Sequence, residues 1–165
     1  MKNGFTLIEL IIVITIIGII TGVVGFVLFG AVDAWTFKFN RSDILSDGRP
    51  AMNRMVREIR EIRDNDSVAT ASSSEFRFTN VDNVDITYNL SSTDLNRTAN
   101  GVTNTLAEDV SGLTFTYYDS CASGATPIAP TVGTDTNIRR VQIDLTLTKN
   151  GENLYVQSQS VPRNF

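Results

Sequence analysis

The sequence has no histidine, and its one cysteine is Cys121. A catalytic Ser/His/Asp or Cys/His group is therefore excluded, and so are the usual zinc sites built from Cys and His ligands. A disulfide within the chain is excluded, because Cys121 has no second cysteine to pair with. Basic residues are scarce in the later part, where eleven Asp or Glu and six Lys or Arg lie from Asp66 to the end. That balance disfavours nucleic acid as a partner, because Lys and Arg are needed to neutralise phosphates.

Charge is also missing from a long segment near the start. Residues 10–32 hold no charged residue, and residues 10–29 read LIIVITIIGIITGVVGFVLF. As an α-helix this run is about 30 Å long, which matches the hydrocarbon core of a bilayer. The run therefore predicts a membrane span. By the positive-inside rule, Lys2 and the terminal amine place the N-terminus in the cytoplasm and the polar remainder outside.

Three interpretations of this run are open. A cleavable secretory signal has a shorter apolar region, of roughly 7 to 15 residues, followed by a cleavage site of small residues. The run is longer than that, and residues 32–34 (VDA) are a poor cleavage site. A permanent signal anchor is the second interpretation. The third comes from the residues just before the run.

Residues 4–9 read GFTLIE. This stretch closely resembles the cleavage motif of type IV prepilins and of the pseudopilins of type II secretion, in which a short basic leader ends in glycine. In that family a membrane-embedded prepilin peptidase cuts after the glycine on the cytoplasmic side and methylates the new N-terminus. The resemblance implies a cut between Gly4 and Phe5 and N-methylation of Phe5. Glu9 then becomes the fifth residue of the mature chain.

Two roles are open for Glu9, the carboxylate that precedes the apolar run. Thr6 and Glu9 fit a capping box, in which Thr6 caps the helix and Glu9 bonds back to the Thr6 amide. A carboxylate deep in a bilayer costs about 2.5 kcal/mol or more, so capping alone explains Glu9 only at the interface. The resemblance implies that Glu9 meets the N-terminal amine of a neighbouring subunit in a filament core. We expect this assembly role, with which capping is compatible.

Small residues in the run favour close contact between helices. Gly18 and Gly22 form a GxxxG pattern, and Gly25 adds a third glycine near the same face. Glycine allows helix backbones to approach closely in a membrane or in a filament core. We therefore expect Gly18 and Gly22 to pack against a neighbouring helix.

A second helical pattern extends from Met52 to Ile62, with apolar residues at helical spacing and charged residues on the other faces. Gly48 and Pro50 predict a kink or short break between Leu45 and Ala51, because proline removes a helical hydrogen bond. The charged face is predicted to be solvated, and a docking surface for a partner subunit is the alternative. Its residues are Arg54, Arg57, Glu58, Arg60, Glu61 and Arg63.

The remainder of the chain has the alternating pattern of β-strands. Apolar residues alternate with polar ones and are rich in β-branched and aromatic types, which predicts strands with one buried face. Asn150-Gly151 predicts a hairpin turn between the last two strands. The polar segment 65–74 is predicted to be a linker. The alternating segments are residues 76–78, 84–90, 113–117, 141–147 and 154–156.

These patterns predict an α+β fold, with a long N-terminal α-helix whose second half packs on an antiparallel β-sheet. The arrangement resembles the pilin fold. We expect four segments along the chain. They are a leader (1–4), a transmembrane or filament-core helix (5–32), its amphipathic continuation (33–64) and a β-sheet globular domain (65–165).

A looser resemblance concerns the globular part. The patterning there looks most like that of W-type minor pilins and of the J-type minor pseudopilin of type II secretion. The residues that carry it lie at 95–97, 106–115 and 140–145.

Residues 119–137 predict a long loop. Cys121 within it is expected to be a small lone residue, and a reactive thiol or an intermolecular crosslink is the alternative. Several aspartates have the oxygen ligands that calcium prefers, but they lack the spacing of a known calcium loop, and no metal site is expected. These are Asp82, Asp85, Asp94, Asp119 and Asp135.

The expected function is that of a minor pilin or pseudopilin, a structural subunit without enzymatic activity or cofactor that is incorporated into a pilus or pseudopilus or primes its assembly. Its expected partners are prepilin peptidase, other pilin or pseudopilin subunits, the inner membrane and the assembly machinery. It would reside in the bacterial inner membrane with its C-terminal domain extracytoplasmic, and then in a pilus or pseudopilus. The alternative is a permanently membrane-anchored extracytoplasmic binding module, in which Glu9 is only a helix cap.

Overall fold

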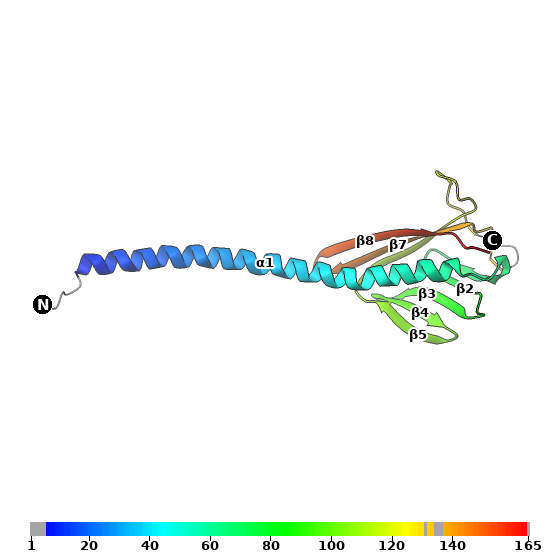
Figure 1. The fold of residues 1–165 in the computed structure, drawn as a ribbon, viewed down its shortest axis with the longest axis horizontal. Helices are drawn as coiled ribbons and strands as arrows, with labels where there is room; N and C mark the ends of the chain where they lie inside the picture. Colours follow the sequence, from blue (N-terminus) through cyan, green and yellow to red (C-terminus); the bar gives the residue numbers. More distant parts are fainter. Residues whose placement is uncertain (1–5, 131, 134–136, 165) are drawn as a thin grey trace. The chain divides into compact units, whose positions relative to one another are not determined.

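The computed structural model describes residues 6–130, 132–133 and 137–164, in two units that comprise residues 1–39 and 40–165. The described part of the first unit is helical from Leu7 onward. The second unit contains the rest of the same helix, α1 (Leu7–Arg60), followed by strands (Figure 1). The predicted α+β fold, with a long N-terminal helix followed by antiparallel sheet, is confirmed.

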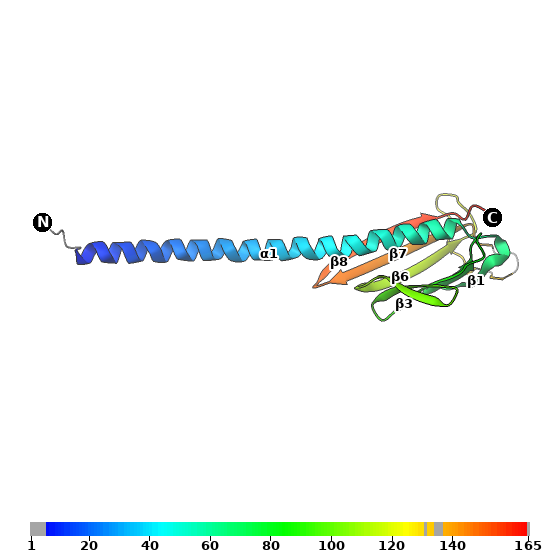
Figure 2. The same cartoon turned by 60° about the horizontal axis from the view of Figure 1, so that its bottom comes forward.

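The strands of the second unit form two antiparallel sheets rather than one (Figure 2). The first sheet has the order β1-β2-β3-β4-β5 and the second has the order β6-β7-β8. Within each sheet, strands that follow one another in sequence are hydrogen-bonded neighbours, and a long loop joins β6 to β7. The strands are β1 (Val68–Ala71), β2 (Glu75–Thr79), β3 (Asp85–Ser91), β4 (Asp94–Ala99), β5 (Val102–Ala107), β6 (Val110–Tyr118), β7 (Arg140–Lys149) and β8 (Glu152–Ser160).

An aromatic cluster joins the two sheets in the core. The ring centroid of Phe76 on β2 lies 5.7 Å from that of Phe115 and 5.4 Å from that of Tyr117, both on β6. The Phe115 amide donates to the Ser73 carbonyl at 2.8 Å, which adds a backbone link between the sheets. Aromatic pairs at such distances contribute beyond the area that they bury, so the two sheets pack as one core.

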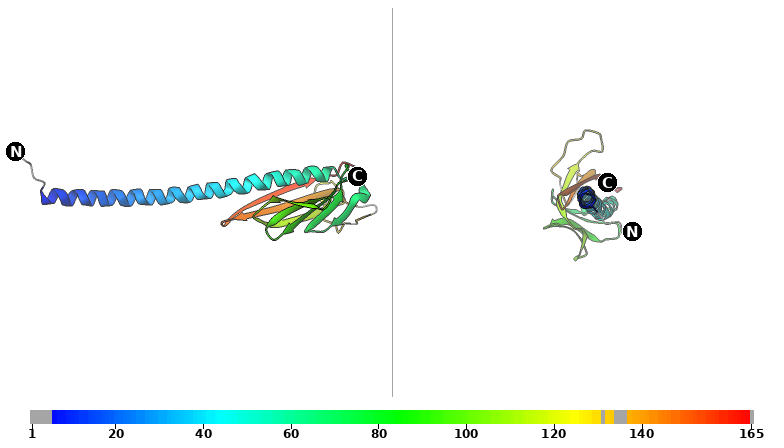
Figure 3. Two further views of the ribbon diagram at one scale, coloured as in Figure 1. Left: turned by 90° about the horizontal axis from the view of Figure 1, so that it is seen from below. Right: turned by 90° about the vertical axis from the view of Figure 1, so that its left-hand side faces the viewer.

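The predicted apolar stripe of the helix forms the other side of this core. Met55, Ile59 and Ile62 are fully buried, and residues 40–60 of α1 lie along the sheets (Figure 3). Gly48 marks the closest approach, because a Cβ added there would lie 2.9 Å from Cδ1 of Leu147 on β7. The absence of a side chain at Gly48 therefore lets β7 pack directly against the helix backbone.

The predicted break near Pro50 is wrong, because α1 is helical through this proline. Pro50 has no amide proton, so the carbonyl of Ser46 loses its donor four residues later. Both residues are exposed, and water can satisfy that carbonyl. The next two residues, Ala51 and Met52, are buried, so tertiary packing holds the helical turn in place.

The predicted linker at residues 65–74 is also wrong in part. A 3₁₀ turn, η1 (Asn65–Ser67), leads directly into β1, an edge strand that pairs with β2. Val68 is fully buried there, and its burial stabilises a strand even though the segment is mostly polar.

The Asn150-Gly151 hairpin is confirmed, because both residues have positive φ, 51° and 85°, and Lys149 pairs with Glu152 across the turn.

Candidate functional site

The described part of the N-terminal segment begins with a capped helix. The Glu9 amide donates to the Thr6 hydroxyl at 3.3 Å, and the Leu10 amide donates to the Thr6 carbonyl at 3.3 Å. Thr6 is therefore the N-cap of α1. Gly4 and Phe5, the predicted sites of cleavage and N-methylation, lie outside the described residues.

The side chain of Glu9 takes no part in this cap. Its carboxylate is exposed and has no hydrogen-bond or ion-pair partner within residues 6–130, 132–133 and 137–164. Of the two hydrogen bonds of a capping box, the one accepted by the Thr6 hydroxyl is present. The other, from the Thr6 amide to the Glu9 carboxylate, is not made. The helix start is thus satisfied by Thr6, which leaves the carboxylate available for another group.

The apolar part of α1 has no covering in the described part of the chain. Every large apolar side chain from Leu7 to Phe39 is between 41% and 81% exposed. A Cβ added at Gly18 or Gly22 would meet nothing within 4 Å, so the predicted helix-packing positions are open. By length and composition this helix can cross a membrane. So large an apolar surface requires lipid or other helices around it.

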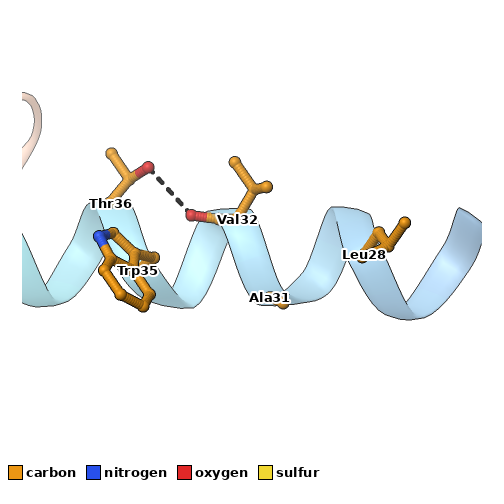
Figure 4. A pocket seen from close by; sticks show the side chains of 5 residues that line it. All are labelled: Leu28, Ala31, Val32, Trp35 and Thr36. Carbon is orange, nitrogen blue, oxygen red and sulfur yellow. Dashed lines mark hydrogen bonds between the residues drawn. The ribbon is translucent and has the colours of Figure 1, made fainter.

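A shallow groove of about 260 Å³ lies near the end of this apolar surface (Figure 4). It is lined by Leu28, Ala31, Val32, Trp35 and Thr36, which all belong to one face of α1. The Thr36 hydroxyl donates to the Val32 carbonyl at 3.0 Å, so its polar atom is satisfied within the helix. Positions 28, 31, 32 and 35 have the spacing of the four residues that surround a knob from a neighbouring helix.

Residues 1–25 match the prokaryotic N-terminal methylation motif. The match includes the stretch GFTLIE and the first turns of the apolar helix, and it supports a type IV pilin-like chain. It ends well before the second unit, whose resemblance to W-type or J-type minor subunits therefore has no support from it. No curated protein sequence matches the chain.

The second unit contains a buried ionic cluster that the sequence prediction missed. Glu58 was expected on a solvated face, and this expectation is wrong, because the residue is only 6% exposed. The Arg97 Nε on β4 donates to both carboxylate oxygens of Glu58, at 2.8 and 3.1 Å. The Tyr88 hydroxyl on β3 and the Arg54 Nε on α1 also donate to this carboxylate. The cluster therefore joins α1 to the first sheet.

Burial and hydrogen bonding act in opposite directions on Glu58. Burial raises the pKa of its carboxyl, but the hydrogen bonds from Arg97, Tyr88 and Arg54 lower it by more, and the pKa lies below its ordinary value of 4.5. Burial, with the neighbouring Glu58 carboxylate, raises the pKa of Tyr88. Glu58 is therefore an anion at neutral pH, and Tyr88 is a neutral donor to it.

The remaining candidate residues are not brought together. Asp85 forms an ion pair with Arg77 at 2.6 Å, and within the described residues no three acidic, histidine or cysteine side chains gather in a way that suits a metal ion. Asp135 lies outside the described residues. Cys121 is exposed in the loop after β6. Its thiol lies 3.8 Å from the Arg139 carbonyl, a weak contact that gives it no chemical role.

Proposed function

We propose that this chain is a pilin-like subunit that is processed by prepilin peptidase between Gly4 and Phe5. It is N-methylated at Phe5, held in the inner membrane by its apolar helix, and then incorporated into a filament. The observation that carries this proposal is the methylation motif at residues 1–25, which includes the first turns of an apolar helix with no covering in the described structure.

The cap geometry supports the assembly role of Glu9. Since Thr6 alone caps the helix in the described structure, the exposed Glu9 carboxylate is free to bind a cation. The N-terminal amine of a neighbouring subunit is the cation that the family resemblance supplies. Pairing neutralises both charges, and it sets register because a misaligned subunit leaves a bare charge among apolar helices. Gly18 and Gly22 then supply close contact between neighbouring helices.

We assign the chain to the minor subunits of a type IV pilus or of a type II secretion pseudopilus. The patterning at residues 95–97, 106–115 and 140–145 supports this assignment by its resemblance to W-type and J-type minor subunits. A structural subunit of this kind performs no chemistry. Its N-terminus faces the cytoplasm and its second unit is extracytoplasmic, as the position of Lys2 before the apolar run indicates.

Replacing Gly4 with leucine is expected to block processing. Glycine has no side chain, and a branched side chain restricts the backbone and adds bulk at the bond to be cut. The Gly4→Leu variant should keep residues 1–4, remain in the membrane fraction and be absent from sheared filaments. The measurement is the mass of the protein from both fractions of the cells in which it is native.

The matched control introduces the same side chain one residue earlier, as Asn3→Leu. This variant should be processed and should enter the filament fraction like the original chain. Normal incorporation of an unprocessed Gly4→Leu chain would contradict the proposal, and so would a filament fraction that lacks the original chain. Either result would favour the permanently anchored binding module.

A further inference from the structure

Charge is unevenly distributed over the second unit. Residues 40–165 carry twelve Lys or Arg and sixteen Asp or Glu, a net acidic balance. Five of the arginines nevertheless lie within residues 49–63, together with only two glutamates. Arg54 and Arg63 form ion pairs with Glu58 and Asp64, so the basic character of this segment rests on Arg49, Arg57 and Arg60 in the last turns of α1. Such asymmetry favours association with an oppositely charged surface.

A groove of about 370 Å³ lies on this segment. We call it the arginine groove, and its charged side chains are Arg57, Arg60, Glu61 and Arg163. None of its three arginines has an ion-pair partner in the described parts of the chain, whereas Arg54 is paired with Glu58. The groove therefore holds three guanidinium groups without an ion pair beside one carboxylate, that of Glu61.

Helix electrostatics explains only part of this concentration. Basic residues in the last turn of a helix interact favourably with its dipole, which accounts for Arg57 and Arg60. Arg163 does not belong to α1 and lies in the tail after β8. The Arg163 amide donates to the Arg60 carbonyl at 3.3 Å, and the Asn164 side chain donates to the Ile62 carbonyl at 2.8 Å. The tail is thus fixed where it adds a third guanidinium to the groove.

A complementary surface occurs elsewhere on the same unit. A groove of about 280 Å³ is lined by Asp47 on α1 and by residues 105–108, which end in Glu108. We call it the acidic groove. Both carboxylates are exposed, and neither has a basic partner within the described residues. At helical geometry Asp47 lies about 15 Å along the axis from Arg57 and about 80° around it, so the two grooves lie on different faces.

We propose that the arginine groove of one subunit binds the acidic groove of a second copy of this chain. The contact is heterologous, because each of the two copies contributes a different surface. The inference rests on the proposed function and adds that copies of the chain are adjacent in the filament. Since the paired groups are exposed, the contact weakens with salt, and the exposed apolar helix supplies the remaining affinity.

Cysteine crosslinking of the full chain tests this contact. In a Cys121→Ser background, Asn53→Cys marks the arginine groove and Thr105→Cys marks the acidic groove. Both positions are exposed and uncharged. A mixture of the two marked chains in native membranes should give crosslinked dimers on mild oxidation. A mixture of Asn53→Cys with Asn153→Cys, at an exposed position on β8, should give about tenfold less dimer. Equal yields from the two mixtures would overturn the proposal.

Charge reversal decides whether the pairing is electrostatic. The double variant Arg57→Glu/Arg60→Glu, introduced into the Asn53→Cys chain, should lower the dimer yield about tenfold, as like charges then face each other. Asp47→Arg/Glu108→Arg in the Thr105→Cys chain should do the same. Mixing the two reversed chains restores opposite charges and should restore the yield. Failure of this restoration, with both variants folded, would overturn the proposal.

The mass of the N-terminal peptide, measured in the same samples, separates this inference from the function on which it rests. Chains that begin at Phe5 but crosslink without regard to charge would leave the pilin-like function standing and overturn the groove contact. Chains that keep residues 1–4 would refute the proposed processing, whatever the crosslinking shows.

Discussion

Replacing Glu58 with alanine is expected to lower the free energy of unfolding of the second unit by about 3–5 kcal/mol. The change leaves the Arg97 guanidinium without its anion, and the Arg97 side chain is only 11% exposed. It also removes the acceptor of the buried Tyr88 hydroxyl. The measurement is the urea midpoint of the full chain in detergent, followed by tyrosine near-UV circular dichroism. All four tyrosines lie in the second unit.

The matched control is Glu61→Ala, which changes the same residue type three residues later, directly after the end of α1. Glu61 has no ion pair in the described structure, so its loss should change stability by less than about 0.5 kcal/mol. An equal effect of the two substitutions would contradict the buried cluster as a link between α1 and the first sheet.

The pKa shift of Glu58 predicts how this stabilisation depends on pH. The folded-state pKa is below the ordinary value of 4.5, so the contribution is present above about pH 4.5 and is lost as pH falls through the folded pKa. Glu58→Gln removes the titrating group. The stability difference between the original chain and Glu58→Gln should therefore be larger at about pH 7 than at about pH 3. A difference independent of pH would show that the charge of Glu58 contributes nothing.

Replacing Glu9 with glutamine is expected to lower incorporation into the filament by about a hundredfold while processing continues. An unpaired ammonium among apolar helices costs about 2.5–3.5 kcal/mol, and each 1.4 kcal/mol is about tenfold in an equilibrium constant. Glutamine keeps the size and hydrogen-bonding capacity of the side chain, and the Thr6 cap does not depend on it. The measurement compares the amounts of the variant in sheared filaments and in membranes.

The matched control is Thr6→Ala, which removes the cap and keeps the carboxylate. This change should weaken the first turn by about 1 kcal/mol and reduce incorporation far less than Glu9→Gln does. If Glu9→Gln assembles normally, the charge pair between subunits is wrong. If Thr6→Ala has the larger effect, the start of the helix matters more for assembly than the charge.

Residues with a strong local pattern were predictable from the sequence. The alternation around Phe76 and Ile143 predicted β2 and β7, because one face of each strand is buried. Asn150-Gly151 predicted its hairpin, since both residues tolerate positive φ. The spacing of Met55 and Ile59 predicted the buried side of α1.

Elements decided by tertiary contacts were missed. The strands β4 and β5 have few apolar residues, and most of β5 is exposed, so alternation gives little signal there. Asn100-Gly101 was the available clue, because it forms a second hairpin turn with φ of 47° and 82°. Glu58 lies about 40° from Ile62 on a helical wheel, close enough to the apolar stripe to be buried. Its partners Tyr88 and Arg97 are distant in sequence, so no local pattern identifies them.

The N-terminal peptide of the protein from its own cell envelope tests the central claim most directly. Cleavage after glutamate should release Phe5–Glu9, and its mass should correspond to FTLIE with one added methyl group on Phe5. That result would establish the chain as a processed, pilin-like subunit. A peptide that begins at Met1 or Lys2 would contradict the account and leave a permanent membrane anchor, and a protein that begins near Trp35 would contradict the filament-core role of the apolar helix.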